Sequence, residues 1–184
     1  MVLTFQALKD KKLSEDDDLS ADVKDLNNYF DIDPEDTELT EGTIDFSVKS
    51  ALEQMITISH NYAALILTKT LNANNLAGDI TPLEIGQFFE KLYKGEIIDP
   101  ENSAKMLDLL SRQQINDRIP KNLPTGTKVA HKTADIDLFE HDAGIVYTPK
   151  GDFIVVVLSE TENPTSASEK IADMSKAVYD YINK

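Results

Sequence analysis

The sequence predicts an α/β fold of the α+β kind, in which a helical lobe precedes antiparallel strands. Apolar residues at helical spacing and strong helix-capping signals run through the first part of the chain. Three β-rich segments follow, and a turn signal joins the last two. An amphipathic C-terminal segment is placed to cover the strands. We therefore expect one domain, residues 1–184, in two lobes of about 1–120 and 121–184.

The composition is that of an acidic protein with enough apolar residues for a core. Apolar residues make up 41% of the chain, and 18 Lys and Arg against 33 Asp and Glu give a net charge of −15. This charge argues against nucleic acid as a partner. The absence of cysteine excludes disulfides and thiol chemistry. No apolar run reaches the ~18–20 residues of a transmembrane helix, and the start of the chain shows no secretory signal.

The N-terminal part is expected to hold one helix and then a long acidic loop. Apolar spacing indicates a helix over residues 2–11, whereas residues 13–43 are polar and are expected to be mostly loop. The alternating carboxylates of this loop fail the spacing of a calcium loop. Asp36 and Gly42 stand where a glycine and a glutamate are needed.

Further helices are expected before residue 114. Thr81-Pro82-Leu83-Glu84 combines an N-cap threonine, a proline at the first helical position and a capping-box glutamate. The expected helices cover 46–56, about 60–71, 82 to Gly95, and from Asp99-Pro100 to about Gln113.

The last third of the chain is expected to form strands and a covering helix. Residues 127–134, 141–148 and 153–160 are rich in β-formers, and Pro149-Lys150-Gly151-Asp152 indicates a hairpin between the last two. Residues 166–182 form an amphipathic helix, whose expected apolar side carries Ile171, Met174, Ala177, Val178 and Tyr181.

Ser59-His60-Asn61 interrupts the most apolar segment of the chain. In one continuous helix Ser59 and Asn61 would point ~200° apart, whereas in an extended turn residues i and i+2 point the same way. The β-branched run before Ser59 is poor for helix. We expect a helix break here, with Ser59 and Asn61 facing a cleft. The alternative is that Ser59 only caps the second helix.

His131-Lys132-Thr133-Ala134-Asp135 lies at the end of the first expected strand, before a loop. A lysine and a threonine at a strand end can bind a carboxylate, by charge and by hydrogen bond. The alternative is that they are ordinary exposed strand residues.

In this order, the two segments resemble motifs of the penicillin-recognising serine hydrolases, closest to class A β-lactamases. That family carries S-x-x-K, then S-D-N on a loop between helices, then K-T-G on a strand. "SHN" is similar to the second motif and "HKTA" to the third. Residues 43–184 also resemble the family in the order of their helical and β-rich segments. The resemblance implies a β-lactamase/transpeptidase-like fold that is incomplete at the N-terminus.

The resemblance also implies a role for each residue in lactam or peptide cleavage. Ser59 would pass a proton to the leaving nitrogen. Lys132 would tune the proton affinity of Ser59 and attract the substrate carboxylate. These two are the candidate catalytic residues. The implied substrate-binding residues are Asn61, Thr133, Ala134 and Asp135, the last through its backbone N–H in the oxyanion hole. His60 and His131 are candidates for lining the site. No cofactor and no metal site are expected.

The sequence departs from the family pattern at several points. None of its serines is followed by lysine three residues later, so these 184 residues lack the nucleophile. The deacylation motif E-x-x-L-N is absent, and the family's longer segment is expected to be missing around residues 76–80. His60 and Ala134 replace the family's Asp and Gly, respectively.

Three interpretations follow. The chain is a β-lactamase-type serine hydrolase, here without its nucleophile and inactive alone, and a D-Ala-D-Ala carboxypeptidase falls within this interpretation. Alternatively, it is a degenerate relative that binds cell-wall or protein partners, or an unrelated helical interaction domain.

The expected ligand is a β-lactam or a peptidoglycan stem peptide, and the expected location is extracellular, cell-surface or periplasmic in a bacterium. An open sheet edge and an apolar face with Ile145, Val155 and Val157 predict self-association or pairing with further segments.

Overall fold

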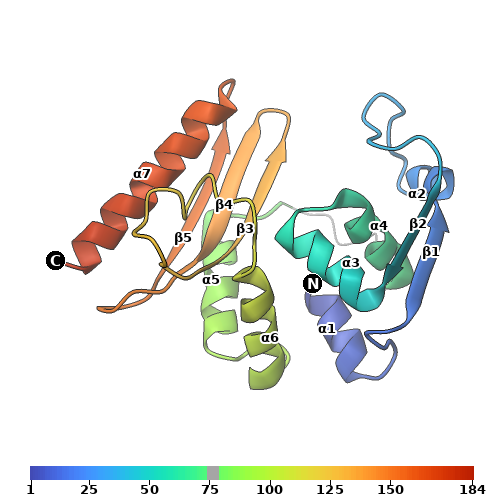
Figure 1. Cartoon of the computed structure of the whole chain (residues 1–184), viewed down its shortest axis with the longest axis horizontal. Coiled ribbons are helices and arrows are strands. Elements are labelled where there is room, and N and C mark those ends of the chain that lie inside the picture. The colour runs from blue at the N-terminus through green and yellow to red at the C-terminus, as the bar shows by residue number, and fades with distance from the viewer. Residues whose placement is uncertain (74–78) are drawn as a thin grey trace. The chain divides into compact units, whose positions relative to one another are not determined.

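The computed structural model describes residues 1–73 and 79–184. The chain divides into two compact units, Met1–Gly78 and Asp79–Lys184 (Figure 1). The lobe boundary expected near residue 120 lies inside the second unit. The segment expected to be missing around residues 76–80 falls mainly on 76–78, outside the described residues.

The first unit contains helices and a small sheet. Its elements are α1 (Val2–Lys9), β1 (Asp18–Asp22), α2 (Val23–Tyr29), β2 (Thr43–Ser47), α3 (Val48–Thr57) and α4 (Asn61–Thr70). β1 and β2 pair antiparallel, with Asp18 opposite Ser47 and Asp22 opposite Thr43. α3 and α4 pack together through buried aliphatic side chains.

One expectation for this unit is incomplete and another is wrong. Residues 13–43 are mostly loop, as expected, but β1 and α2 lie within them. Residues 46 and 47 belong to β2 rather than to a helix. Both strands are polar and bury few side chains, such as Leu19 and Ile44, so their alternation is weak in the sequence. Asp22 caps α2 by accepting from the backbone N–H groups of Lys24 and Asp25.

The second unit is a three-stranded antiparallel sheet with helices. Its elements are α5 (Pro82–Tyr93), α6 (Pro100–Leu110), β3 (Val129–Ile136), β4 (Phe139–Val146), β5 (Phe153–Glu160) and α7 (Pro164–Ile182). The strand order is β3-β4-β5. The expected capping box at Thr81 is present, and the expected hairpin joins β4 to β5. β3 runs two residues beyond the expected strand, so Asp135 lies within the strand, opposite Glu140, and not in a loop.

α7 packs along one face of this sheet (Figure 1). Ile171 joins Ile119, Val129 and Val146 in the core, with Val155 and Val157 partly buried against them. Val156 points to the other face, where it lies near Gly86 of α5. The expectation of an uncovered apolar face is therefore wrong for Ile145, which is buried.

The predicted apolar side of α7 is also partly wrong. Met174, Val178 and Tyr181 are exposed, Tyr181 at 74%. The buried side is made mainly of small residues, which let the helix approach the strands closely: Ala167, Ser168, Ile171, Ala172 and Ser175. A helical pattern is recognised from large apolar residues, so packing through small residues was not predicted from the sequence.

Gly144 of β4 lies directly opposite His131 of β3. An added Cβ would lie 2.6 Å from the carbonyl oxygen of Ala130 and would collide with the Cβ of His131. Gly144→Ala is therefore expected to lower the free energy of unfolding by at least ~2 kcal/mol, measured by urea denaturation. Gly86→Ala is the matched control. Its Cβ would meet only Val156 at 3.9 Å, and alanine should stabilise α5 by ~0.5–1 kcal/mol. A Gly144→Ala variant as stable as the wild type would contradict the close approach of β3 and β4.

Candidate functional site

The Ser59 segment breaks the chain between two helices, as predicted. α3 ends with Ile58 as its C-cap, and α4 begins after His60. Ser59 takes a left-handed backbone conformation with φ 56°. This conformation costs ~1–2 kcal/mol for a residue with a Cβ. The surrounding structure therefore holds Ser59 in it.

His60, and not Ser59, is the N-cap of α4. Its Nδ1 accepts a hydrogen bond from the backbone N–H of Ala63 at 3.3 Å, and its ring meets Phe46 edge to face at 5.4 Å. The alternative that Ser59 merely caps the second helix is therefore wrong. Histidine is not among the preferred capping residues, so an imidazole cap at this place could not be predicted from the sequence.

Asn61 is the first residue of α4, and its side chain is exposed. Its Nδ2 donates to the carboxylate of Glu38, in the segment between α2 and β2. The same segment is fastened by Tyr62, whose hydroxyl donates to the carbonyl oxygen of Leu39 at 2.9 Å. Glu38 could not be found from the sequence, because its contact with Asn61 spans 23 residues and no motif joins the two.

Lys132 and Thr133 lie side by side in β3 and point to opposite faces of the sheet. The Lys132 ammonium donates to the carbonyl oxygen of Thr133 at 2.7 Å. Burial lowers the pKa of the Lys132 ammonium, the charges of Asp135 and Asp142 partly oppose this shift, and Arg118 adds to it. The Thr133 side chain is buried, and its Oγ1 has no hydrogen-bond partner among the residues that the structure describes.

His131 is buried, and its ring lies within hydrogen-bond distance of a buried carboxylate. Its Nδ1 lies 2.9 Å from Oδ1 of Asp142, and its Nε2 lies 3.3 Å from Oδ1 of Asn116. Asp142 also accepts the backbone N–H of Ile119 at 3.0 Å. These hydrogen bonds connect β3, β4 and the segment from Asn116 to Ile119, next to Lys132.

A buried ion pair lies on the same side of the sheet as Thr133. The Arg118 guanidinium, 4% exposed, binds the buried carboxylate of Glu140. It also donates to the carbonyl oxygen of His141 at 3.1 Å and lies 3.7 Å from Asp135. Arg118 was not predicted as a site residue. A lone arginine between a helix and a strand carries no pattern that marks it.

The predicted site residues therefore fall into two groups. Ser59, His60 and Asn61 belong to the first unit, and His131, Lys132, Thr133, Ala134 and Asp135 to the second. The role implied for Lys132 toward Ser59 stays a prediction.

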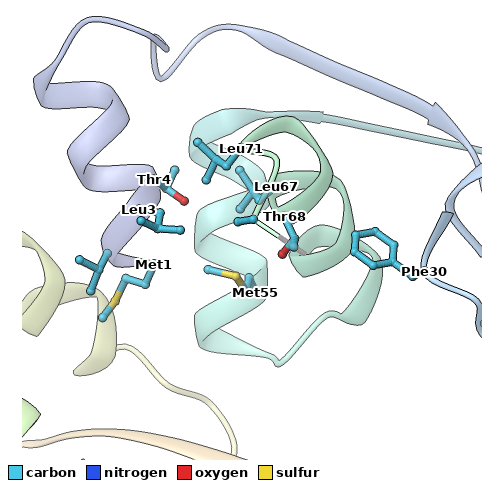
Figure 2. Close-up of a pocket in the computed structure, with 10 residues that line it drawn as sticks. Met1, Leu3, Thr4, Phe30, Met55, Leu67, Thr68 and Leu71 are labelled. Atoms are coloured by element: carbon cyan, nitrogen blue, oxygen red, sulfur yellow. The ribbon is translucent and has the colours of Figure 1, made fainter. Parts of the chain in front are cut away.

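The first unit also holds an apolar cavity of about 470 Å³. Figure 2 shows residues of α1, including Leu3 and Thr4, near Met55 of α3 and Leu67 of α4. The Thr68 hydroxyl in its wall donates to the carbonyl oxygen of Ala64. Among the described residues that line it, no side chain is an acid, a base or a cation, and none is a predicted site residue.

Comparison with family models identifies the family of the chain, and comparison with solved structures identifies its fold. The model of the "Beta-lactamase enzyme family" matches residues 1–182. No curated protein sequence matches the chain.

Solved structures resemble the chain over nearly its whole length. PBP-A is similar with a TM-score of 0.79 at 24% sequence identity, over 99% of this chain and 77% of that one. A beta-lactamase from Sphaerobacter thermophilus DSM 20745 gives a TM-score of 0.81 at 19% identity, over 99% and 78%. A representative of class A beta-lactamase from Bacteroides cellulosilyticus DSM 14838 gives 0.76 at 20%, over 99% and 80%. The predicted β-lactamase/transpeptidase-like fold is confirmed.

The His60 cap contributes to the stability of the first unit, because its Nδ1 accepts the Ala63 N–H at the start of α4. His60→Ala should therefore lower the free energy of unfolding by ~1 kcal/mol, measured by urea denaturation. His60→Asp should keep the cap and most of this free energy. A His60→Ala variant as stable as the wild type would contradict the cap.

Proposed function

The chain belongs to the beta-lactamase enzyme family, and on that premise we propose that it binds a β-lactam or a D-Ala-D-Ala-like peptide without cleaving it as a 184-residue chain. The family resemblance gives Ser59 and Asn61 as candidate ligand contacts in the first unit, and Lys132 and Thr133 as candidate ligand contacts in the second. Asn61 could bind an amide of a ligand only by leaving Glu38. The backbone N–H of Asp135 would donate to the scissile carbonyl oxygen.

The unpaired hydroxyl of Thr133 carries the proposal. Buried polar groups nearly always have a hydrogen-bond partner, and an exception requires an explanation. Thr133 Oγ1 has none among the described residues, and it stands at the strand position where the family resemblance puts a ligand contact. Lys132 beside it is half-buried, so its charge is less screened than that of a surface lysine.

Lactam cleavage needs a nucleophile that these 184 residues do not supply in the family's motif. In that chemistry a serine oxygen forms an ester with the lactam carbonyl, the C–N bond breaks, and the nitrogen takes a proton. Ser59 and Lys132 would serve only the proton transfer. A mutant of PBP-A is known as an acyl-enzyme complex with penicillin G, so we use this compound as the probe for binding.

We expect the chain to bind penicillin G, measured by calorimetry, and not to hydrolyse a chromogenic cephalosporin. Lys132→Met and Thr133→Val should each weaken binding by about tenfold or more, because each removes a hydrogen bond or charge contact to the ligand. Lys170→Met, an exposed lysine of α7, is the control and should leave binding unchanged. Serine-dependent turnover of the cephalosporin would refute the absence of catalysis. Binding that is unaffected in both β3 variants would refute the site.

A binding module is the second candidate function. The absence of S-x-x-K and E-x-x-L-N from these residues favours it. Its ligand would be a peptidoglycan stem peptide, and tighter binding of an acyl-D-Ala-D-Ala peptide than of penicillin G would support this candidate. Either function fits an exported, cell-surface or periplasmic location in a bacterium. No helix in the described part of the chain is long and apolar enough to cross a membrane.

We also propose that the chain self-associates through β5. Among the described residues β5 pairs only with β4, and its stretch from Phe153 to Leu158 carries no charge. Long uncharged edge strands invite pairing with another strand, and a lysine on the edge discourages it.

Sedimentation velocity at increasing protein concentration tests whether the chain self-associates through β5. The wild type should form dimers or larger species, and Ile154→Lys should shift it toward the monomer. Leu138→Lys replaces another exposed aliphatic residue, in the β3–β4 turn, and should leave association unchanged. A monomeric wild type at all concentrations would contradict the proposal.

A further inference from the structure

A pocket of about 430 Å³ lies at the end of the sheet where β3 begins and β4 ends. Its wall includes Lys128, which precedes β3, Tyr147, which follows β4, and Tyr179 of α7. None of the predicted site residues is among the described residues that line it. The pocket therefore shares no described residue with the proposed lactam or peptide site.

The two tyrosine rings of this pocket are held in place by the surrounding structure. Tyr179 is half-buried and packs against the core of the second unit. The backbone N–H of Tyr147 donates to the carbonyl oxygen of Lys128 at 3.0 Å. The centroid of the half-buried Tyr147 ring lies 6.3 Å from that of Tyr93 in α5. A side chain that is already ordered loses little conformational entropy when a ligand packs on it, so the aromatic surface is preformed.

Polar groups of fixed orientation lie beside these rings. Asp152 accepts the Tyr93 hydroxyl at 2.8 Å and the backbone N–H of Thr148 at 2.9 Å, through different carboxylate oxygens. The hydroxyls of Thr127 and Thr148 donate to backbone carbonyl oxygens, which leaves their lone pairs able to accept. The carboxylate and the two threonine oxygens can therefore accept hydrogen bonds from hydroxyl groups of a ligand.

The charges of the pocket balance. Lys128 and Asp152 are its charged residues in the described part of the chain. The Lys128 ammonium lies 5.1 Å from the centroid of the Tyr147 ring, so a ligand beside the ring meets a hydrogen-bond donor. Burial raises the pKa of the Tyr147 phenol, and Asp152 and Tyr93 add to this shift, which keeps the phenol neutral. The pocket consequently suits an uncharged ligand better than an anion or a cation.

We propose that this pocket binds a neutral oligosaccharide, with one pyranose ring packed on Tyr147. The face of a β-linked pyranose ring carries axial C–H groups and is apolar, whereas its rim carries hydroxyl groups. The apolar face matches an aromatic ring, and the rim matches Asp152, Lys128 and the two threonine hydroxyls. Aromatic surface combined with a few placed polar groups is typical of small-molecule sites. The proposal goes beyond the lactam or peptide site and does not depend on it.

The probe is N-acetylated chitotriose, a neutral β-linked trisaccharide. The chain has 6 tyrosines and no tryptophan, so its tyrosine fluorescence should change on binding. Calorimetry then gives the affinity of each variant. Tyr147→Leu keeps an apolar side chain and removes the flat ring, so it should weaken binding by about tenfold. Tyr147→Phe keeps the ring and should stay within about threefold of the wild type. Urea denaturation checks that both variants are folded.

Tyr181→Leu is the matched control. Tyr181 also has a lysine ammonium near its ring, that of Lys184 at 5.5 Å from the centroid, but it is 74% exposed and does not line the pocket. Its replacement should leave the affinity unchanged. A loss as large as that of Tyr147→Leu would mean that the sugar packs on any exposed tyrosine, and would overturn the proposal.

Two further results would also overturn the oligosaccharide site. One is a wild type that does not bind the trisaccharide at millimolar concentration, and the other is a folded Tyr147→Leu variant that binds it as tightly as the wild type. Penicillin G tested on the same wild-type protein separates the two proposals. Trisaccharide binding without penicillin G binding would refute the proposed function and support the oligosaccharide site.

Discussion

The arrangement of the second unit depends on the buried carboxylate of Asp142. It receives the His131 ring and the backbone N–H of Ile119, so one side chain links β4 to β3 and to the segment that carries Arg118. Gly144, two residues along β4, lets the strands approach closely at His131. Losing either side chain would leave a buried polar group without its hydrogen bond, which costs about 1–3 kcal/mol. Lys132 and Thr133 owe their positions to this junction.

The elements that the sequence predicted well are those with a local chemical signal. The Thr81 capping box, the Asp99 N-cap and the turn before β5 each depend on neighbouring residues, and the structure has all three. β1 and β2 were missed, since two polar five-residue strands become recognisable only when they pair across some 20 residues of chain. The side of α7 that packs on the sheet was wrongly predicted for a related reason. The helix packs through the side that fits the strands most closely, which is not its most apolar side.

The candidate site was predictable in its motif residues and not in their partners. "SHN" and "HKTA" could be found because spacing and order carry them. Glu38 on Asn61, Asp142 on His131 and the carboxylates on Arg118 are contacts between distant segments. These partners decide the local charge, and therefore the chemistry that the motif residues can perform. A motif thus locates a site more reliably than it describes the ligand.

The left-handed backbone of Ser59 constrains which side chains this position can accept over evolutionary time. Threonine would preserve the hydroxyl, yet its branched Cβ makes a positive φ more costly than it is for serine. Glycine and asparagine suit the backbone and discard the hydroxyl. Divergent lineages of this sequence should therefore keep serine here while the hydroxyl is used, and once it is not, drift toward residues that no longer resemble an alcohol.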